Sequence, residues 1–212
     1  MNESHKPAAA AAHLAPEADA LLRFWFGDAE AARPEWFTKD KALDAEVDRR
    51  FGAEIEAALK GKLDHWQASA EGSLALVMLL DQFTRNVFRG TRRAFAGDAR
   101  ALAVARRMVA AGQDQALVPL RRVFVYLPFE HAEDSAAQDD SVRLFTALAA
   151  PGHAGLAAGA PHAATLANYL DYAERHRDVI RRFGRFPHRN ALLGRTSTAQ
   201  ETEFLEQPGS GF

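Results

Sequence analysis

Three apolar helical stripes in this sequence end in ionisable side chains, and those side chains are the ones that could do chemistry. The stretches are Leu80–Asn86, Tyr126–Asp134 and His176–Asn190. An ionisable group on a face that points to the core must find a partner or a ligand, or change its pKa. A histidine or carboxylate held in this way can act as a general acid or base. The candidate catalytic residues are Asp81, Glu130, His131 and His176.

The first stretch places an aspartate and an arginine on one face of a helix. An apolar stripe from Leu74 to Met78 runs into Asp81, and Arg85 follows one turn later. Such an i,i+4 pair stabilises an exposed helix by only about 0.2–0.5 kcal/mol. If the pair is buried, removal of one partner costs about 3–5 kcal/mol. The stretch therefore predicts either a structural ion pair near a helix end or one part of a polar site.

The second stretch combines a histidine, a glutamate and a proline. The apolar stripe of residues 120–127 continues into Glu130, His131 and Asp134. Pro128 has no N–H to donate to the carbonyl of the preceding turn, so we expect a kink. A kink beside Glu130 and His131 could shape a pocket. The alternative is that His131 is an ordinary core histidine and that Pro128 only bends the helix.

The third stretch is rich in arginine and contributes His176 on a core-facing stripe. Arg189 and Asn190 begin a short helix after Pro187, so its N–H groups could meet an anion. The alternative is that these arginines pair with the acidic residues between 130 and 140. Candidate ligand-binding residues are those able to hold an anion or to complete such a site: Arg85, Asn86, Asp134, Arg189 and Asn190.

Several familiar motifs fail on their context. His176-Arg177-Asp178 matches a kinase catalytic-loop tripeptide, but the sequence has no Gly-rich loop and no Lys on a strand. No nucleophile elbow, P-loop or dinucleotide fingerprint is present. His131 and Asp134 share a helix face, but the paired Glu-x-x-His motif of di-iron bundles is missing. We predict no metal and no cofactor.

Composition limits the class of protein. The chain has 212 residues, 48% of them hydrophobic, which suits one domain with a sizeable core. It contains no cysteine, and its formal net charge of −2 argues against a nucleic-acid-binding domain with a broad basic field. The longest apolar run, Leu74–Leu80, is too short to span a bilayer. We expect a soluble cytoplasmic protein without a membrane partner, and the oligomeric state stays open.

The elements that must position these residues are all predicted to be helices. Helical periodicity recurs along the chain, and no stretch shows the period-two alternation of a strand. We expect residues 1–15 to be a disordered leader, residues 16–212 to form one all-α domain of about 8–10 helices, and residues 151–160 to be a loop. The expected helices cover about 16–26, 41–60, 73–88, 98–111, 119–133, 135–150, 161–183, 188–193 and 198–206. Short loops between them indicate antiparallel neighbours.

Long blocks of the sequence resemble a known bacterial family. The blocks are LLDQFTRNVFRG, RAFAGD, FVYLPFEHAED, SVRLF and HRDVIRRFGRFPHRNALLGRTST, with the ending FLEQPGSGF. They are similar to the family catalogued as domain of unknown function 924, over about residues 18 to 212. Thr84 stands where the family usually has proline, and PGSGF stands where PGSSF is common. The resemblance implies an all-α, tetratricopeptide-like stack of helical hairpins, and it implies no activity, cofactor or catalytic residue.

Two functions and one purely structural role fit these observations. The first is a binding module whose helical hairpins hold an anionic small molecule or an acidic peptide segment. The second is an enzyme with a histidine or carboxylate general base and an arginine clamp on an anionic substrate. The third is that the polar residues only specify helix packing. Both functions require Asp81, His131 and His176 to meet in one place.

Overall fold

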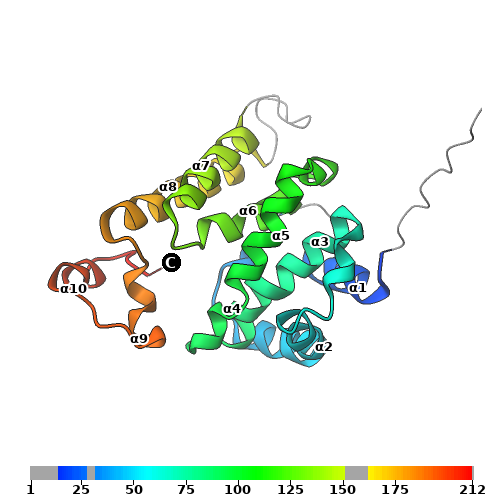
Figure 1. The fold of residues 1–212 in the computed structure, drawn as a ribbon, viewed down its shortest axis with the longest axis horizontal. Coiled ribbons are helices and arrows are strands. Elements are labelled where there is room, and N and C mark those ends of the chain that lie inside the picture. The colour runs from blue at the N-terminus through cyan, green and yellow to red at the C-terminus, as the bar shows by residue number, and fades with distance from the viewer. Residues whose placement is uncertain (1–13, 28–31, 151–161, 212) are drawn as a thin grey trace, which may run out of the picture.

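The computed structural model describes residues 14–27, 32–150 and 162–211. Helices and short helical turns form in these ranges, without a strand, which confirms the all-α prediction (Figure 1). Most of the predicted leader and the predicted loop at 151–160 lie outside the described residues. The α-helices are α1 (Pro16–Phe26), α2 (Lys41–Leu59), α3 (Ala70–Val77), α4 (Thr84–Val87), α5 (Asp98–Ala110), α6 (Pro119–Glu130), α7 (Ser135–Ala149), α8 (Ala163–Phe183), α9 (Asn190–Leu193) and α10 (Ala199–Leu205).

Side-chain caps fix several helix starts. The Asp40 carboxylate accepts hydrogen bonds from the N–H groups of Ala42 and Leu43 at the start of α2. Asp134 caps α7 by accepting from Ala137 N at 2.8 Å. This cap requires extended backbone at Asp134, so α6 ends at Glu130 and not near residue 133 as the sequence predicted. Each cap satisfies N–H groups that have no partner inside the helix.

Helix α3 lies at the centre of the hydrophobic core. Every residue from Leu74 to Leu80 is buried, and α3 packs against α1, α5 and α6. Three large aromatic side chains join α1, α6 and the residues after α3: the ring of Trp25 lies 5.2 Å from Phe83 and 6.1 Å from Phe124. This burial explains why residues 74–80 are all apolar. No helix in the described ranges is long and apolar enough to cross a membrane.

The predicted continuous helix over residues 73–88 is interrupted. Residues Met78–Phe83 form a π-helical segment between α3 and α4, and all six are buried. The carbonyl oxygen of Leu80 lies so close to Gly97 that a Cβ there would be 2.0 Å from it. This close approach of α5 to the widened turn needs a residue without a side chain. Asp81 belongs to this segment, so the irregular turn sets its direction.

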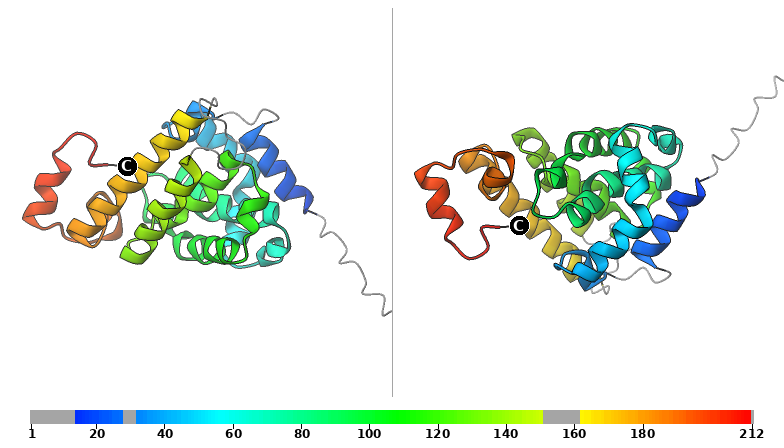
Figure 2. Two further views of the ribbon diagram at one scale, coloured as in Figure 1. Left: turned by 90° about the horizontal axis from the view of Figure 1, so that it is seen from above. Right: turned by 90° about the horizontal axis from the view of Figure 1, so that it is seen from below.

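The C-terminal part, residues 184–211 after α8, lies outside the main core. Helices α7 and α8 pack as an antiparallel pair, and α9 and α10 follow beyond the end of α8, opposite α1 (Figures 1 and 2). A separate cluster of Val179, Ile180 and Phe186 supports this part. The C-terminal part therefore has its own small core. It carries His188 and Arg189 back toward the end of α6.

Candidate functional site

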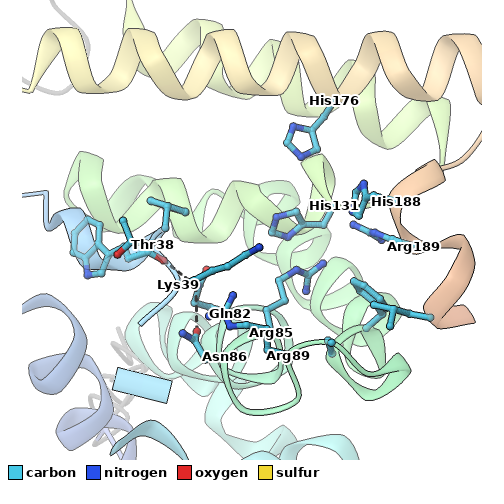
Figure 3. Close-up of a pocket in the computed structure, with 16 residues that line it drawn as sticks. Thr38, Lys39, Gln82, Arg85, Asn86, Arg89, His131, His176, His188 and Arg189 are labelled. Atoms are coloured by element: carbon cyan, nitrogen blue, oxygen red, sulfur yellow. Dashed lines mark hydrogen bonds between the residues drawn. The ribbon is translucent and has the colours of Figure 1, made fainter. Parts of the chain in front are cut away.

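One pocket collects side chains from all three polar stretches (Figure 3). Its volume is about 360 Å³, at the lower end of the range of about 300–1,000 Å³ for small-molecule sites. Five parts of the chain surround it: the connector before α2 (residues 32–40), the residues around α4, the end of α6, α8, and the start of α9. The lining residues are Trp36, Phe37, Thr38, Lys39, Gln82, Arg85, Asn86, Arg89, Gly90, Ala94, Phe95, His131, His176, His188, Arg189 and Leu192.

The ionic lining of the pocket is cationic. Lys39, Arg85, Arg89 and Arg189 line it, whereas no aspartate or glutamate of the described residues does. The carboxylates that pair with the arginines, Asp44 with Arg89 and Asp98 with Arg85 and Arg189, do not line the pocket.

Arg85 is the centre of the ion-pair network. Its Nη1 donates to Asp98 Oδ1 at 2.9 Å and to the carbonyl oxygen of Asp81 at 2.9 Å. The same Nη1 lies 3.0 Å from Asp81 Oδ1, so the predicted i,i+4 pair is confirmed. Asp81 is only 2% exposed. Burial opposes its ionisation, but Arg85 and His131 outweigh that effect and hold the pKa of Asp81 below its ordinary value.

Asp81 also fixes the orientation of His131. The imidazole Nδ1 lies 2.9 Å from both carboxylate oxygens of Asp81. Burial, and then the charge of Arg85, lower the pKa of His131 below its ordinary value. A neutral imidazole that donates Nδ1–H to a carboxylate carries its lone pair on Nε2. The geometry is that of a histidine base oriented by an aspartate.

Arg189 is buried with few hydrogen bonds for its charge. Its side chain is 6% exposed, and its Nη1 lies 3.3 Å from Asp98 Oδ2. Its guanidinium lies over the rings of Phe95 and Phe186, 4.7 and 4.5 Å from their centroids. Its Nε has no hydrogen-bond partner among the described residues. Burial and the neighbouring Arg85 lower the pKa of Arg189 to about 10.

Glu130 and His176 form a second buried pair at the back of the site. His176 Nδ1 donates to the carbonyl oxygen of Tyr172 at 2.8 Å and lies 3.3 Å from Glu130 Oε1. Burial, and then the charge of Asp81, raise the pKa of Glu130 to about 8. Burial lowers the pKa of His176 well below its ordinary value. At neutral pH, Glu130 is mainly a neutral acid and His176 a neutral base.

Lys39 completes the cationic lining. Arg89 Nε donates to Asp44 Oδ2 at 2.8 Å, and Asn86 Nδ2 donates to Asp44 Oδ1 at 2.7 Å. No carboxylate of the described residues lies within ion-pair distance of Lys39. Figure 3 shows its side chain reaching across the pocket toward Arg85 and His131. A lysine directed at an arginine and a neutral histidine is placed to share an anion with them.

The structure brings most of the predicted site residues together. Those that line the pocket or lie directly behind it are Asp81, Arg85, Asn86, Glu130, His131, His176 and Arg189. Asp134 does not line the pocket, because it caps α7 and pairs with Arg106 at 3.3 Å. Asn190 does not line it either. Its amide is buried between Ser197 and Arg195, at 3.0 and 2.9 Å.

Seven arginines lie in residues 175–195, and the alternative interpretation, pairing with acidic residues between 130 and 140, is correct for two of them. Arg181 pairs with Asp139 at 2.9 Å, and Arg195 pairs with Glu133 through two bonds of 2.6 and 2.9 Å. Arg181 joins α8 to α7, and Arg195 joins the C-terminal part to the residues before α7. They do not line the pocket.

Sequence reasoning missed several lining residues. Lys39, Arg89 and His188 were not among the candidates, although all three line the pocket. Arg89 continues the i,i+4 series of Asp81 and Arg85, which was a usable signal. Lys39 lies on the connector before α2, where no helical periodicity predicts the direction of a side chain. In the described ranges, no three histidine or carboxylate side chains are grouped as metal ligands.

Comparisons with known proteins agree with the fold. The chain is similar to a solved structure of a protein of unknown function, ATU0120, from Agrobacterium tumefaciens. The identity is 42%, the TM-score is 0.77, and the match covers 89% of this chain and 96% of that one. No curated protein matches the chain. The family described as "Bacterial protein of unknown function (DUF924)" matches residues 21–209. The chain therefore belongs to the DUF924 family.

Proposed function

We propose that the pocket binds a small anionic molecule. The observation that carries this proposal is Arg189, a buried guanidinium whose Nε has no partner among the described residues and which shares Asp98 with Arg85. A buried charge is costly unless it is well paired. An anion in the pocket would supply a counter-charge to this guanidinium, which lines the pocket. Lys39, directed into the same space, supports this (Figure 3).

The size of the pocket favours a small molecule over an acidic peptide segment. A volume of about 360 Å³ holds a compact ligand and not several residues of an extended chain. The lining also offers amide groups from Gln82 and Asn86, which can orient a polar ligand. An acidic segment of a partner protein is the alternative occupant. It would give binding by peptides and not by small anions.

Calorimetric titration with inorganic phosphate tests the proposal. We expect the wild-type protein to bind phosphate and Arg189→Gln to bind it roughly tenfold or more weakly, since a charge-assisted hydrogen bond contributes about 1.5–3 kcal/mol. Arg143→Gln is the matched control, because Arg143 is exposed on α7 and pairs with Asp140. Unchanged affinity in Arg189→Gln would contradict the proposal. So would a lack of response to phosphate, sulfate and small carboxylates.

The Asp81–His131 pair favours a second candidate function, an enzyme acting on the bound anion. His131 would be the general base through Nε2, with Asp81 orienting it and Arg85 and Arg189 holding the substrate. The test is a screen of p-nitrophenyl phosphate, sulfate and carboxylate esters. We expect one class to be hydrolysed and His131→Gln to lower kcat by about 10²–10⁴-fold. Phosphate binding should persist in that variant. Equal turnover in His131→Gln would exclude this role.

We also propose a finer description of the fold and its setting. The antiparallel packing of α6, α7 and α8 supports a tetratricopeptide-like stack of hairpins within one domain over residues 16–212. The cationic pocket would then lie between the stacked helices and the C-terminal part. We propose a cytoplasmic location for the protein.

A further inference from the structure

We propose that the anion bound by this pocket carries a planar ring, and that the ring packs on Phe37. The inference rests on the proposed anion binding and specifies the class of ligand. It starts from a side chain that the anion site does not use. Phe37 is 53% exposed, and Tyr172 is the other large apolar side chain exposed in the described ranges. Of the two, Phe37 lines the pocket.

Phe37 is held as a fixed surface. Its ring stacks on that of Phe124, with centroids 6.0 Å apart and an interplanar angle of 13°. The ring of Tyr169 meets it at 64°, with centroids 5.6 Å apart. Phe124 and Tyr169 contact the ring on the side that faces the core, and more than half of the surface of Phe37 stays accessible. A rigid aromatic surface at a pocket favours stacking with a second ring.

The volume of the pocket exceeds what a bare anion fills. One water occupies about 30 Å³ in the liquid, so the five bonded heavy atoms of phosphate take up less than roughly 150 Å³, which is less than half of the pocket. The pocket measures about 360 Å³. Its lining also includes large apolar side chains, those of Trp36, Phe37, Phe95 and Leu192. A ligand with an apolar part uses both the space and these surfaces.

The connector before α2 links the two kinds of contact. Phe37 precedes Lys39 by two residues, and Lys39 points toward Arg85 and His131 (Figure 3). The same short segment therefore offers an aromatic face and a cation directed to the anion site. A ligand with its charged group among Lys39, Arg85 and Arg189 can place a neighbouring ring on Phe37. Aryl phosphates and aromatic carboxylates have this form.

Calorimetric titration with phenyl phosphate and methyl phosphate separates the contribution of the ring to the binding free energy from that of the charged group. We expect wild-type protein to bind phenyl phosphate about three- to tenfold more tightly, since an aromatic pair contributes about 0.5–1.5 kcal/mol. Phe37→Ala should remove this difference and leave the affinity for methyl phosphate unchanged. Phe37→Trp should retain the difference, and Tyr172→Ala, the matched exposed aromatic, should leave both affinities unchanged.

Four results would overturn the inference. Equal affinity of wild-type protein for the two phosphates, or an unchanged preference in Phe37→Ala, excludes a ring on Phe37 while the anion site stands. Failure of wild-type protein to bind either phosphate refutes the anion site and the inference with it. Equal loss of both ligands in Phe37→Ala assigns Phe37 a role in shaping the connector and also overturns the inference.

Discussion

Glu130 has a carboxyl group that is poorly supplied with partners. Its Oε1 lies 3.3 Å from His176 Nδ1, and its Oε2 is buried without a hydrogen bond among the described residues. Burial raises the pKa of Glu130 to about 8 from an ordinary value of 4.5. Between these values the folded protein retains a proton that the unfolded chain releases. The group therefore stabilises the fold at low pH, and this contribution is lost as pH rises through 8.

The variant Glu130→Gln should be more stable than wild type at alkaline pH. Glutamine keeps the shape of the neutral acid and cannot ionise. We expect the difference in unfolding free energy to grow between pH 4.5 and 8.5 by an amount on the order of 4 kcal/mol. Urea unfolding at several pH values measures it. A difference that stays constant over this range would show that Glu130 ionises in the folded protein as it does in the unfolded chain.

At the scale of elements, the π-helical segment is the feature that shapes the site. Residues Met78–Phe83 widen the turn between α3 and α4, and π-helical turns of this kind often occur at functional sites. The hydroxyl of Thr84 donates to the carbonyls of Leu80 and Asp81, at 2.9 and 3.0 Å. These two bonds hold Thr84 against the widened turn that contains Asp81.

Gly97 is the residue that the widened turn requires. A Cβ at this position would lie 2.0 Å from the carbonyl oxygen of Leu80, which is backbone and cannot rotate away. We expect Gly97→Ala to destabilise the protein by about 3 kcal/mol. Gly52→Ala is the control with the opposite sign, since a Cβ there meets only the flexible side chain of Asp48. It should stabilise α2 by about 0.5–1 kcal/mol, and urea unfolding compares the two.

Local signals in the sequence predicted the helices well, because apolar periodicity and caps act within a few residues. The departures come from tertiary contacts. The start of α5 packs against residues 78–83, and no pattern within either segment of the sequence predicts this contact. Likewise, the cap at Asp134 and the end of α6 compete for the same residues. The sequence could predict that one helix ends and the next begins near residues 131–134. It could not predict whether these residues would extend α6 or precede α7.

At the scale of the molecule, the meeting of distant polar residues could be predicted only in part. The stripes predicted that Asp81, His131 and His176 face inward, and the structure places Asp81 against His131 and the two imidazoles 6.2 Å apart. Lys39 could not be found in this way. It lies on a connector, and the folding of the C-terminal part, with Arg189, decides which residues share its pocket.

The C-terminal part closes one wall of the pocket, and it is attached largely through charge. Arg195 pairs with Glu133, and Arg189 with Asp98, while only a small cluster around Phe186 adds apolar contact. Partly exposed ion pairs weaken as ionic strength rises. Added salt therefore weakens anion binding in two ways. It screens the contacts between the anion and the cationic side chains, and it weakens the ion pairs that hold the C-terminal part against the pocket. Affinity should fall with salt more steeply than the number of contacting cations alone would give.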